Sequence, residues 1–421
     1  MSDVQATQHR TSSPEALGKA SVLIAGAGIG GLCAAIAFAR AGVPVQVFEQ
    51  QPLPVTVGAG IQLSPNATRV LASLELLDPI ARVATRPQAL ETRSYRSGRV
   101  IARHELNAEW TNTMGAPYLH VYRPDLMRVL IEQVAGYPNI HLAWGTRVDA
   151  FREDDGGVSV ITEKGEFTGA VLIGADGIHS RVASGLFPDV SPTYTGQTAY
   201  RALVRADQLP PGHYPVQATV YWGPGRHIVS YFVGDYMNLV CVVEGEAPGK
   251  ESWVEPASKA AMLAHFKAWH EPLVRLLERA DPETIYKWSL YDRPPLPAWS
   301  RSRVTLLGDA CHAMLPFLAQ GAAMAIEDAG VLSALVTPML ANRKVDGVAL
   351  RSALQDYDQL RLARTHWVQA GARRNATVFH LKGIAAWLRN RAAAKAGHRT
   401  LDRLYRFDVE TNLRNFLAQK K

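Results

Sequence analysis

Cysteine is scarce in this chain of 421 residues, which contains only Cys33, Cys241 and Cys311. The number is odd, the three are far apart, and no two have CxxC or zinc-ligand spacing. A disulfide framework and a cysteine-based metal site are therefore excluded. We expect reduced thiols, a cytoplasmic location and no bound metal.

The sequence also has little excess charge and few long apolar runs. Its 45 Lys and Arg residues against 38 Asp and Glu give a net charge of +7, and the body has no basic run interleaved with aromatics. Nucleic acid is therefore not expected as a partner. Residues 1–20 are polar, without an apolar core of signal-peptide length, and we expect a disordered lead-in. No apolar run reaches the roughly 18 residues that span a membrane, so we expect no stable membrane insertion.

The clearest local unit is "SVLIAGAGIGGLCAAIAFARAGVPVQVFEQ", Ser21–Gln50. It is typical of a buried strand, a glycine turn, a helix and a second strand. Gly26, Gly28 and Gly31 form GxGxxG: the first makes the turn, the second admits a pyrophosphate and the third lets helix pack on strand. Glu49 ends the second strand, where a carboxylate accepts hydrogen bonds from a ribose. The unit predicts a dinucleotide site without distinguishing NAD from FAD.

The middle of the chain has a different pattern. Residues 91–104 predict a hairpin, and residues 144–177 predict short strands joined by Asp-Gly and Lys-Gly turns. Residues 195–244 are β-branched and aromatic, which indicates a separate antiparallel sheet packed against helices at 258–269 and 272–279. From Gly321 onward the chain is mostly helical.

Two later motifs decide the cofactor. "VLIGADGIHSRV" (Val171–Val182) and "VTLLGDACHAMLPFLAQGAAMAIEDA" (Val304–Ala329) resemble the Asp-Gly and Gly-Asp motifs of the single-component FAD-dependent aromatic hydroxylases. With the GxGxxG unit and "GAGIQLSPN" (Gly58–Asn66), the resemblance runs from about Ser21 to Tyr357. It is strongest to salicylate, 3-hydroxybenzoate and 6-hydroxynicotinate hydroxylases.

The resemblance implies an α/β fold. A Rossmann-like FAD-binding domain would occupy residues 20–190 and 300–365. A β-rich substrate domain would be inserted at residues 191–299, and a helical C-terminal segment would follow at residues 366–421.

The resemblance also implies cofactor contacts. Asp309 would contact the ribityl-phosphate region of FAD, Arg123 would contact the cofactor, and Asp176 would lie beside the pyrophosphate. The helix after Pro316 would point its N-terminus at the flavin ring, with Gly321 and Ala322 small enough for backbone to approach. The positive end of that helix would stabilise a reduced, anionic flavin.

Substrate contacts are expected on the inserted sheet. His227 and Tyr231 in "RHIVSYF" share one face of a strand, about 13 Å apart at ~3.3 Å per residue. His227 could take the proton of a phenol, and Tyr231 could orient or relay it. Gln62 stands where 6-hydroxynicotinate hydroxylases have histidine, and glutamine cannot act as a base. Arg201 could pair with a substrate carboxylate or brace the sheet.

The implied reaction uses NADH or NADPH and O2 to hydroxylate a phenolic or heteroaromatic carboxylic acid. Alternatives are a decarboxylating hydroxylase of the 6-hydroxynicotinate type, a nicotinamide-dependent dehydrogenase using only the N-terminal site, and a flavoprotein that makes only peroxide. The basic tail, from Phe379 to Arg406, is a solvated face or a subunit contact, as in a homodimer, and membrane contact is the weaker reading.

Overall fold

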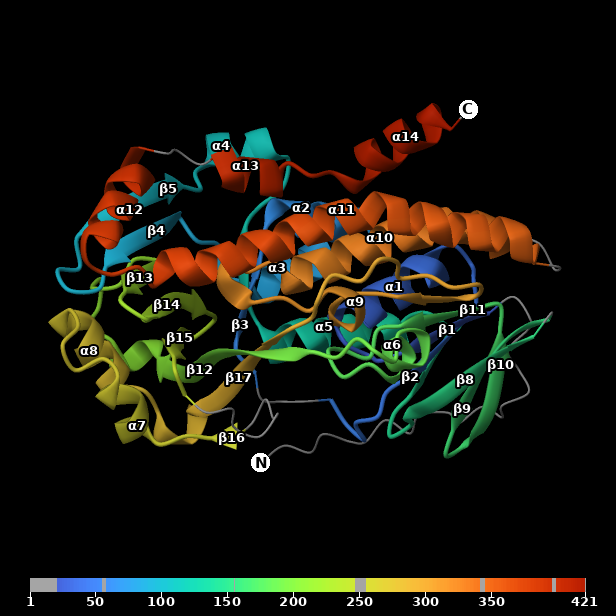
Figure 1. The fold of residues 1–421 in the computed structure, drawn as a ribbon, viewed down its shortest axis with the longest axis horizontal. Coiled ribbons are helices and arrows are strands. Elements are labelled where there is room, and N and C mark those ends of the chain that lie inside the picture. Colours follow the sequence, from blue (N-terminus) through green and yellow to red (C-terminus); the bar gives the residue numbers. More distant parts are fainter. Residues whose placement is uncertain are drawn as a thin grey trace.

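The computed structural model describes residues 21–54, 58–154, 156–246, 255–340, 345–395 and 399–420. The proposed lead-in, residues 1–20, lies outside these ranges. A parallel sheet with helices and a large, mainly antiparallel sheet lie side by side, and two long helices run across both (Figure 1).

The parallel sheet has the strand order β18-β11-β1-β2-β7, and all its neighbours are parallel. Its strands are β1 (Val22–Ala25), β2 (Val45–Phe48), β7 (Ile140–Ala143), β11 (Val171–Gly174) and β18 (Val304–Leu306). The helices beside it are α1 (Ile29–Arg40), α5 (Arg123–Ala135), α6 (Arg181–Leu186) and α9 (Asp309–His312). Helix α1 packs against α10 and α5, so β1 is buried along its whole length. The other face is covered by a three-stranded sheet, where Phe48 packs against Phe167 with ring centroids 5.0 Å apart. Burial on both faces explains why the strands are continuous apolar runs.

A separate three-stranded antiparallel sheet precedes β11. It consists of β8 (Val148–Asp154), β9 (Gly157–Thr162) and β10 (Gly165–Gly169). The Lys164-Gly165 turn makes the predicted reversal, with Gly165 at φ +123°. The strands expected between residues 144 and 177 are thus confirmed.

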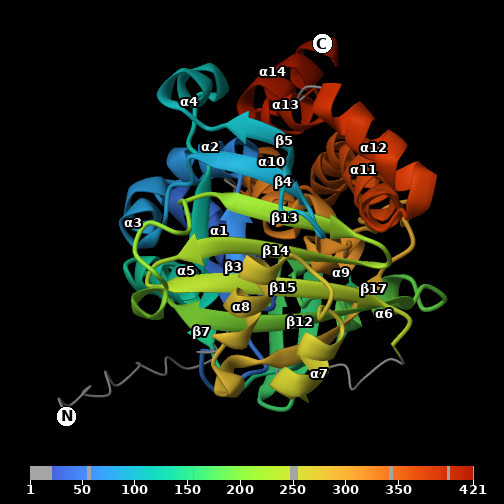
Figure 2. The same cartoon turned by 90° about the vertical axis from the view of Figure 1, so that its left-hand side faces the viewer.

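The large sheet has eight strands in the order β16-β17-β12-β15-β14-β13-β4-β5, spread across Figure 2. They are β4 (Ala89–Ser94), β5 (Val100–Glu105), β12 (Thr193–Arg205), β13 (Ala218–Gly223), β14 (Arg226–Val233), β15 (Tyr236–Glu244), β16 (Glu255–Pro256) and β17 (Tyr286–Asp292). The antiparallel sheet expected from residues 195–244 and the hairpin at residues 91–104 are both present. That hairpin joins the large sheet through the parallel pair β4–β13. The division into domains remains a prediction.

The large sheet has two different faces. Its outer face packs against α7 (Lys259–Ala264) and α8 (Glu271–Glu278), which lie in front of it in Figure 2. Its inner face meets the short helix η4 (Pro316–Leu318) and the two-stranded sheet of β3 (Gly60–Leu63) and β6 (Leu119–Tyr122). The remaining short elements are α2 (Pro65–Ser73), α3 (Leu77–Val83), α4 (Ala108–Met114), η2 (Ala206–Gln208) and η3 (Pro282–Thr284).

The C-terminal part is helical, as expected. It contains α10 (Gly321–Leu340), α11 (Gly347–Phe379), α12 (Gly383–Lys395), α13 (Arg399–Tyr405) and α14 (Val409–Gln419). The expectation that no apolar run reaches the length of a membrane span is wrong, because α10 is long and apolar enough by length and composition. However, 72% of its apolar window is buried, because α10 packs against α1, α2 and α11. It is the central core helix of the fold.

Candidate active site

The expected cofactor residues lie at one edge of the parallel sheet. Gly26, Glu49, Asp176 and Asp309 follow the carboxyl ends of β1, β2, β11 and β18, which are adjacent in the sheet. Carboxyl ends of parallel strands point to the same edge, where open α/β sheets bind ligands. Glu49 accepts a hydrogen bond from the backbone N–H of Ala27 at 2.9 Å. The sheet therefore brings residues from distant parts of the sequence to one site.

The three glycines of the first turn have different surroundings. Gly26 has φ +102°, and a Cβ there would lie 2.4 Å from the carbonyl oxygen of Ala175. A Cβ on Gly31 would lie 2.1 Å from the carbonyl oxygen of Gly26. A Cβ on Gly28, by contrast, would meet nothing within 4 Å. Gly26 and Gly31 are therefore required by the fold, whereas Gly28 leaves room for a ligand at the start of α1.

This difference gives a prediction. Gly28→Ala should weaken FAD binding while leaving the thermal stability of the apoprotein unchanged, because φ −73° suits alanine. Gly31→Ala should lower the stability of the apoprotein itself. Flavin fluorescence titration and thermal unfolding of both apoproteins measure the two effects. Equal loss of stability in both variants would contradict the assignment of Gly28 to the ligand.

Asp309 is the first residue of α9 and lies beside the N-terminus of α10. Its Oδ1 is 3.9 Å from the position that a Cβ on Gly321 would occupy. Gly321 and Ala322, the first residues of α10, are both partly exposed. Asp309 is itself exposed, yet desolvation raises its pKa, opposed by His312, Arg123 and Arg293. A side chain that is both accessible and desolvated lies on the wall of a deep recess.

Arg123 and Asp176 border the same region. Arg123 is the first residue of α5, and burial lowers its pKa while Asp309 and Glu49 act in the opposite direction. Asp176 accepts hydrogen bonds from the Ser180 hydroxyl at 2.5 Å and from the backbone N–H of Arg181 at 2.8 Å. Its carboxylate therefore caps the start of α6, a contact that the sequence analysis did not foresee.

We expect Asp309→Ala to weaken FAD binding by roughly 10- to 150-fold, the loss of one hydrogen bond to a charged group. The apoprotein should be no less stable at neutral pH. A carboxyl whose pKa is raised in the folded state costs stability once it ionises, so removing it relieves that cost. Ultrafiltration assays of FAD retention test this, with exposed Asp189 changed to Ala as the control. Full flavin retention in Asp309→Ala would refute the assignment.

The three candidate catalytic residues lie on the inner face of the large sheet and at its border. Tyr231 on β14 stacks near His120, with ring centroids 4.6 Å apart, and a Cβ on Gly60 would lie 2.5 Å from its Cε2. Gln62 accepts a hydrogen bond from the Tyr118 hydroxyl at 2.7 Å and also hydrogen-bonds Tyr231. Burial raises the pKa of Tyr231, so its hydroxyl is a proton donor at neutral pH. Gln62 and Tyr231 are thus brought together.

His227 lies at the other end of the same face. It is 1% exposed, and its ring packs edge-on against Phe317 of η4, with centroids 4.9 Å apart. Its Nδ1 is 2.8 Å from Nε2 of His380, the residue that follows α11. Burial lowers the pKa of His227 well below its ordinary value, so the ring is neutral. His380 was not recognised from the sequence, since it is 153 residues away from its partner.

Between His227 and Tyr231 the inner face stays partly accessible. Val229 pairs across strands with Val240, which pairs with Arg201, so the three side chains share the face. Both valines are partly exposed, whereas Arg201 is 8% exposed. Burial lowers the pKa of Arg201 to about 10, which leaves it cationic at neutral pH. This accessible patch is apolar, with a buried cation on one side.

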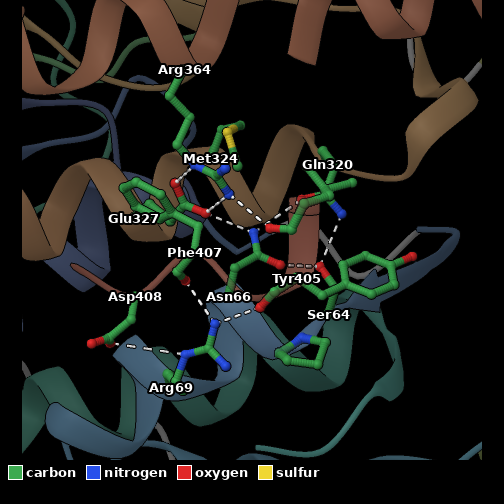
Figure 3. A network of polar contacts seen from close by, with 12 residues as sticks. Ser64, Asn66, Arg69, Gln320, Met324, Glu327, Arg364, Tyr405, Phe407 and Asp408 are labelled. Atoms are coloured by element: carbon green, nitrogen blue, oxygen red, sulfur yellow. Dashed lines mark hydrogen bonds and ion pairs between the residues drawn. The ribbon is translucent and has the colours of Figure 1, made fainter. Parts of the chain in front are cut away.

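A buried ionic network lies behind the site, around the acidic end of the Gly-Asp motif (Figure 3). Glu327 accepts hydrogen bonds from Asn66 at 2.7 Å, Arg361 at 2.6 Å and Arg364 at 2.6 Å. Asp328 accepts from Arg361 at 2.7 Å and from the backbone N–H of Gly308. These bonds join α2, α10 and α11 to the Gly-Asp turn. The adjacent Glu and Asp were the visible signal, but their arginine partners could not be identified from sequence.

The three cysteines are free and buried. Cys311, His312 and Asp328 have potential metal-ligating atoms within 4.8 Å of one another. His312 Nε2 is already 2.6 Å from Asp328 Oδ2, and the other Asp328 oxygen pairs with Arg361. These groups therefore satisfy one another, and we assign no metal site to them.

The chain matches the FAD-binding-domain family over residues 19–372. It therefore belongs to that family. The open space beside Gly28, the accessible Asp309 and the free start of α10 fit such a cofactor. The chain is an FAD-dependent monooxygenase with NADH or NADPH as co-substrate, and the dehydrogenase alternative loses its basis.

Individual relatives are similar over most of their length. The chain is 38% identical over 381 residues to 3-amino-4-hydroxybenzoate 2-monooxygenase PtnB3 of Streptomyces platensis, covering 89% of this chain and 92% of that one. It is 39% identical over 322 residues to 6-hydroxynicotinate 3-monooxygenase of Bordetella bronchiseptica, covering 75% and 82%. Klebsiella pneumoniae HpxO, solved with FAD and uric acid, superposes with a TM-score of 0.77 at 26% identity, covering 94% and 97%. The resemblance and the α/β flavoprotein fold expected from the motifs are confirmed.

Proposed function

We propose that this monooxygenase hydroxylates a phenolic or heteroaromatic carboxylic acid of the hydroxybenzoate kind. The observation that carries the proposal is the accessible apolar patch of Val229 and Val240 on the inner face. It has a neutral histidine at one end, a tyrosine donor at the other and a buried cation beside it. In a planar aromatic acid, the ring would fit the apolar patch, the hydroxyl would meet the histidine or the tyrosine, and the carboxylate would pair with the cation. The names of the two curated relatives, one acting on a hydroxybenzoate and one on a hydroxynicotinate, agree with this class.

The cofactor residues keep the roles that the motifs predict. We assign Gly26, Gly28 and Gly31 to the pyrophosphate turn and Glu49 to the adenosine ribose. The remaining assignments, toward the pyrophosphate, the ribityl chain and the flavin ring, are Arg123, Asp176, Asp309, Gly321 and Ala322. The cap that Asp176 provides to α6 supports a role in holding the segment after β11 beside Gly26.

The substrate residues divide by what each side chain can do. His227 is the proton acceptor for the ring hydroxyl, because its imidazole is neutral. Tyr231 is a donor to a substrate oxygen, and Gln62 orients Tyr231 without acting as a base. Arg201 neutralises the substrate carboxylate. When bound, FAD supplies the redox chemistry and oxygen activation.

The test is NADH and NADPH oxidation by the purified protein with product mass. The panel is salicylate, 3- and 4-hydroxybenzoate, 3-amino-4-hydroxybenzoate and 6-hydroxynicotinate. We expect a gain of one oxygen with at least one acid, and CO2 release would identify the decarboxylating alternative. Peroxide alone with every acid would reject the proposed substrate class.

We further propose a cytoplasmic homodimer. The basic helical tail, α12 to α14, is the segment that would contact a second copy. Light scattering coupled to size-exclusion chromatography measures the mass, and a monomer at all concentrations would reject the dimer.

A further inference from the structure

A chain of polar side chains leads from His227 to the protein surface. His227 Nδ1 lies 2.8 Å from His380 Nε2, and His380 Nδ1 lies 2.5 Å from Glu244 Oε1. The three come from β14, the end of α11 and the end of β15. His227 is 1% exposed, whereas the Glu244 side chain is 45% exposed. The chain therefore connects a fully buried ring to a solvent-accessible carboxylate.

The bonding pattern assigns the protons. Glu244 can only accept when ionised, so His380 Nδ1 carries a proton and its Nε2 is the acceptor. His227 Nδ1 must then carry the proton that it donates to His380. His227 Nε2 is left as the acceptor nitrogen of the ring. This is the tautomer that a base needs.

Burial prevents His227 from holding a second proton and becoming cationic. Desolvation lowers its pKa, and a positive His380 would lower it further. The neighbouring Phe317 and Phe379 carry no charge to compensate. An isolated imidazole here would be a poor base, because protonation would place a bare cation in the core. The cost of a buried cation is avoided if Nδ1 releases its proton while Nε2 takes one, because the ring then stays neutral.

The surroundings of His380 and Glu244, at the solvent end of this series of hydrogen bonds, favour proton release. Desolvation lowers the pKa of His380; Glu244 opposes this, and Arg389 and Arg226 reinforce it. Arg389 is held by the carbonyl oxygens of Val378 and Phe379, both at 2.8 Å. The two arginines disfavour charge on His380 and leave exposed Glu244 as the group that exchanges protons with water.

We propose that His227, His380 and Glu244 form a proton relay that carries the substrate's hydroxyl proton to solvent. The inference rests on the proposed function. His227 Nε2 accepts the substrate proton while its Nδ1 proton passes to His380 Nε2. The Nδ1 proton of His380 passes to Glu244, which releases it to water. One proton leaves the substrate, one reaches solvent, and both imidazoles end neutral. His380 and Glu244 are positioning residues that act through His227.

Turnover with the panel acid that the wild type hydroxylates tests the relay. His380→Ala should lower kcat by about tenfold or more, with KM and FAD content unchanged, and added imidazole should restore part of the rate. Glu244→Gln keeps the acceptor oxygen but cannot take up a proton, so its kcat should show an altered pH profile. His265→Gln is the control. His265 pairs with Glu246 at 2.8 Å and lies next to Tyr200, on the outer face of the large sheet. Unchanged pH profiles in His380→Gln and Glu244→Gln would overturn the relay.

A second measurement needs no substrate. Ring-15N histidine NMR of the FAD-loaded protein should show His227 protonated on Nδ1 and neutral at pH 7. Its signals, identified among 13 histidines by difference with His227→Gln, should shift in His380→Gln. A neutral His227 that carries its proton on Nε2 would overturn the relay. This result does not depend on whether any acid of the panel is hydroxylated. Hydroxylation by the wild type with unaffected relay variants would reject the relay alone, and no hydroxylation by the wild type would reject the proposed function.

Discussion

His227→Gln is expected to lower the rate of hydroxylation by about 100-fold or more while FAD stays bound. Glutamine keeps polar atoms near those of the imidazole but cannot accept a proton, and general base catalysis contributes about 10²–10⁴-fold. FAD should be retained because the ring packs against Phe317, Phe379 and His380, and His227 is not among the residues assigned to the cofactor.

The measurement is single-turnover product formation across pH, with flavin absorbance giving the cofactor content. NADH or NADPH oxidation should continue in His227→Gln, with peroxide replacing hydroxylated product. His213→Gln is a matched control, since His213 is exposed and lies in the segment between η2 and β13. An unchanged rate and pH profile in His227→Gln would return this residue to a packing role.

Arg361→Met should destabilise the folded protein by about 3–5 kcal/mol, the cost of breaking a buried ion pair from one side. Arg361 is 0% exposed and bonds both Glu327 and Asp328, so its loss removes the guanidinium that neutralises Asp328. Methionine fills similar space, so lost packing contributes little. Denaturant unfolding measures the effect, with Arg351→Met on the exposed side of α11 as the control. Equal stability of Arg361→Met and Arg351→Met would contradict this prediction and show that Arg364 alone neutralises Glu327.

The same network predicts a pH dependence. Burial acts to raise the pKa of Glu327, but Arg364 and Arg361 outweigh it, and the net pKa lies below the ordinary 4.5. A carboxyl with a depressed folded pKa stabilises the fold fully above its unfolded pKa and loses that contribution as pH falls through the folded value. Wild-type stability should therefore decrease below about pH 4.5, and Arg361→Met should lose part of this dependence, because Arg364 still pairs with Glu327.

The candidate site was partly predictable because its landmarks are local. The Gly-Asp turn and the GxGxxG turn each combine a strand end, a glycine and a helix start within a few residues. Parallel pairing then brings any such strand ends to one edge, so Glu49, Asp176 and Asp309 could be grouped before the strand order was known. His227 and Tyr231 were placed on one face because alternation along a strand is also local.

The rest depended on contacts between distant residues. The partners of His227 and Glu327 could not be named, because no local rule links a strand to the end of a helix 153 residues later, or one helix to the next. The length and hydropathy criterion for a membrane span failed for a related reason. A mostly buried central helix is as apolar as a spanning one, and only its neighbours distinguish them.

The sequence by itself determined the turn glycines, the strand and helix periods and the family. These follow from backbone sterics and from side-chain spacing, which act within a few residues. Tertiary structure alone decided which buried charges neutralise one another, which ring nitrogen of His227 meets His380, and that a parallel pair joins β4 to β13. Such choices minimise the cost of desolvating polar groups over the whole fold, and that cost is not a property of any one segment.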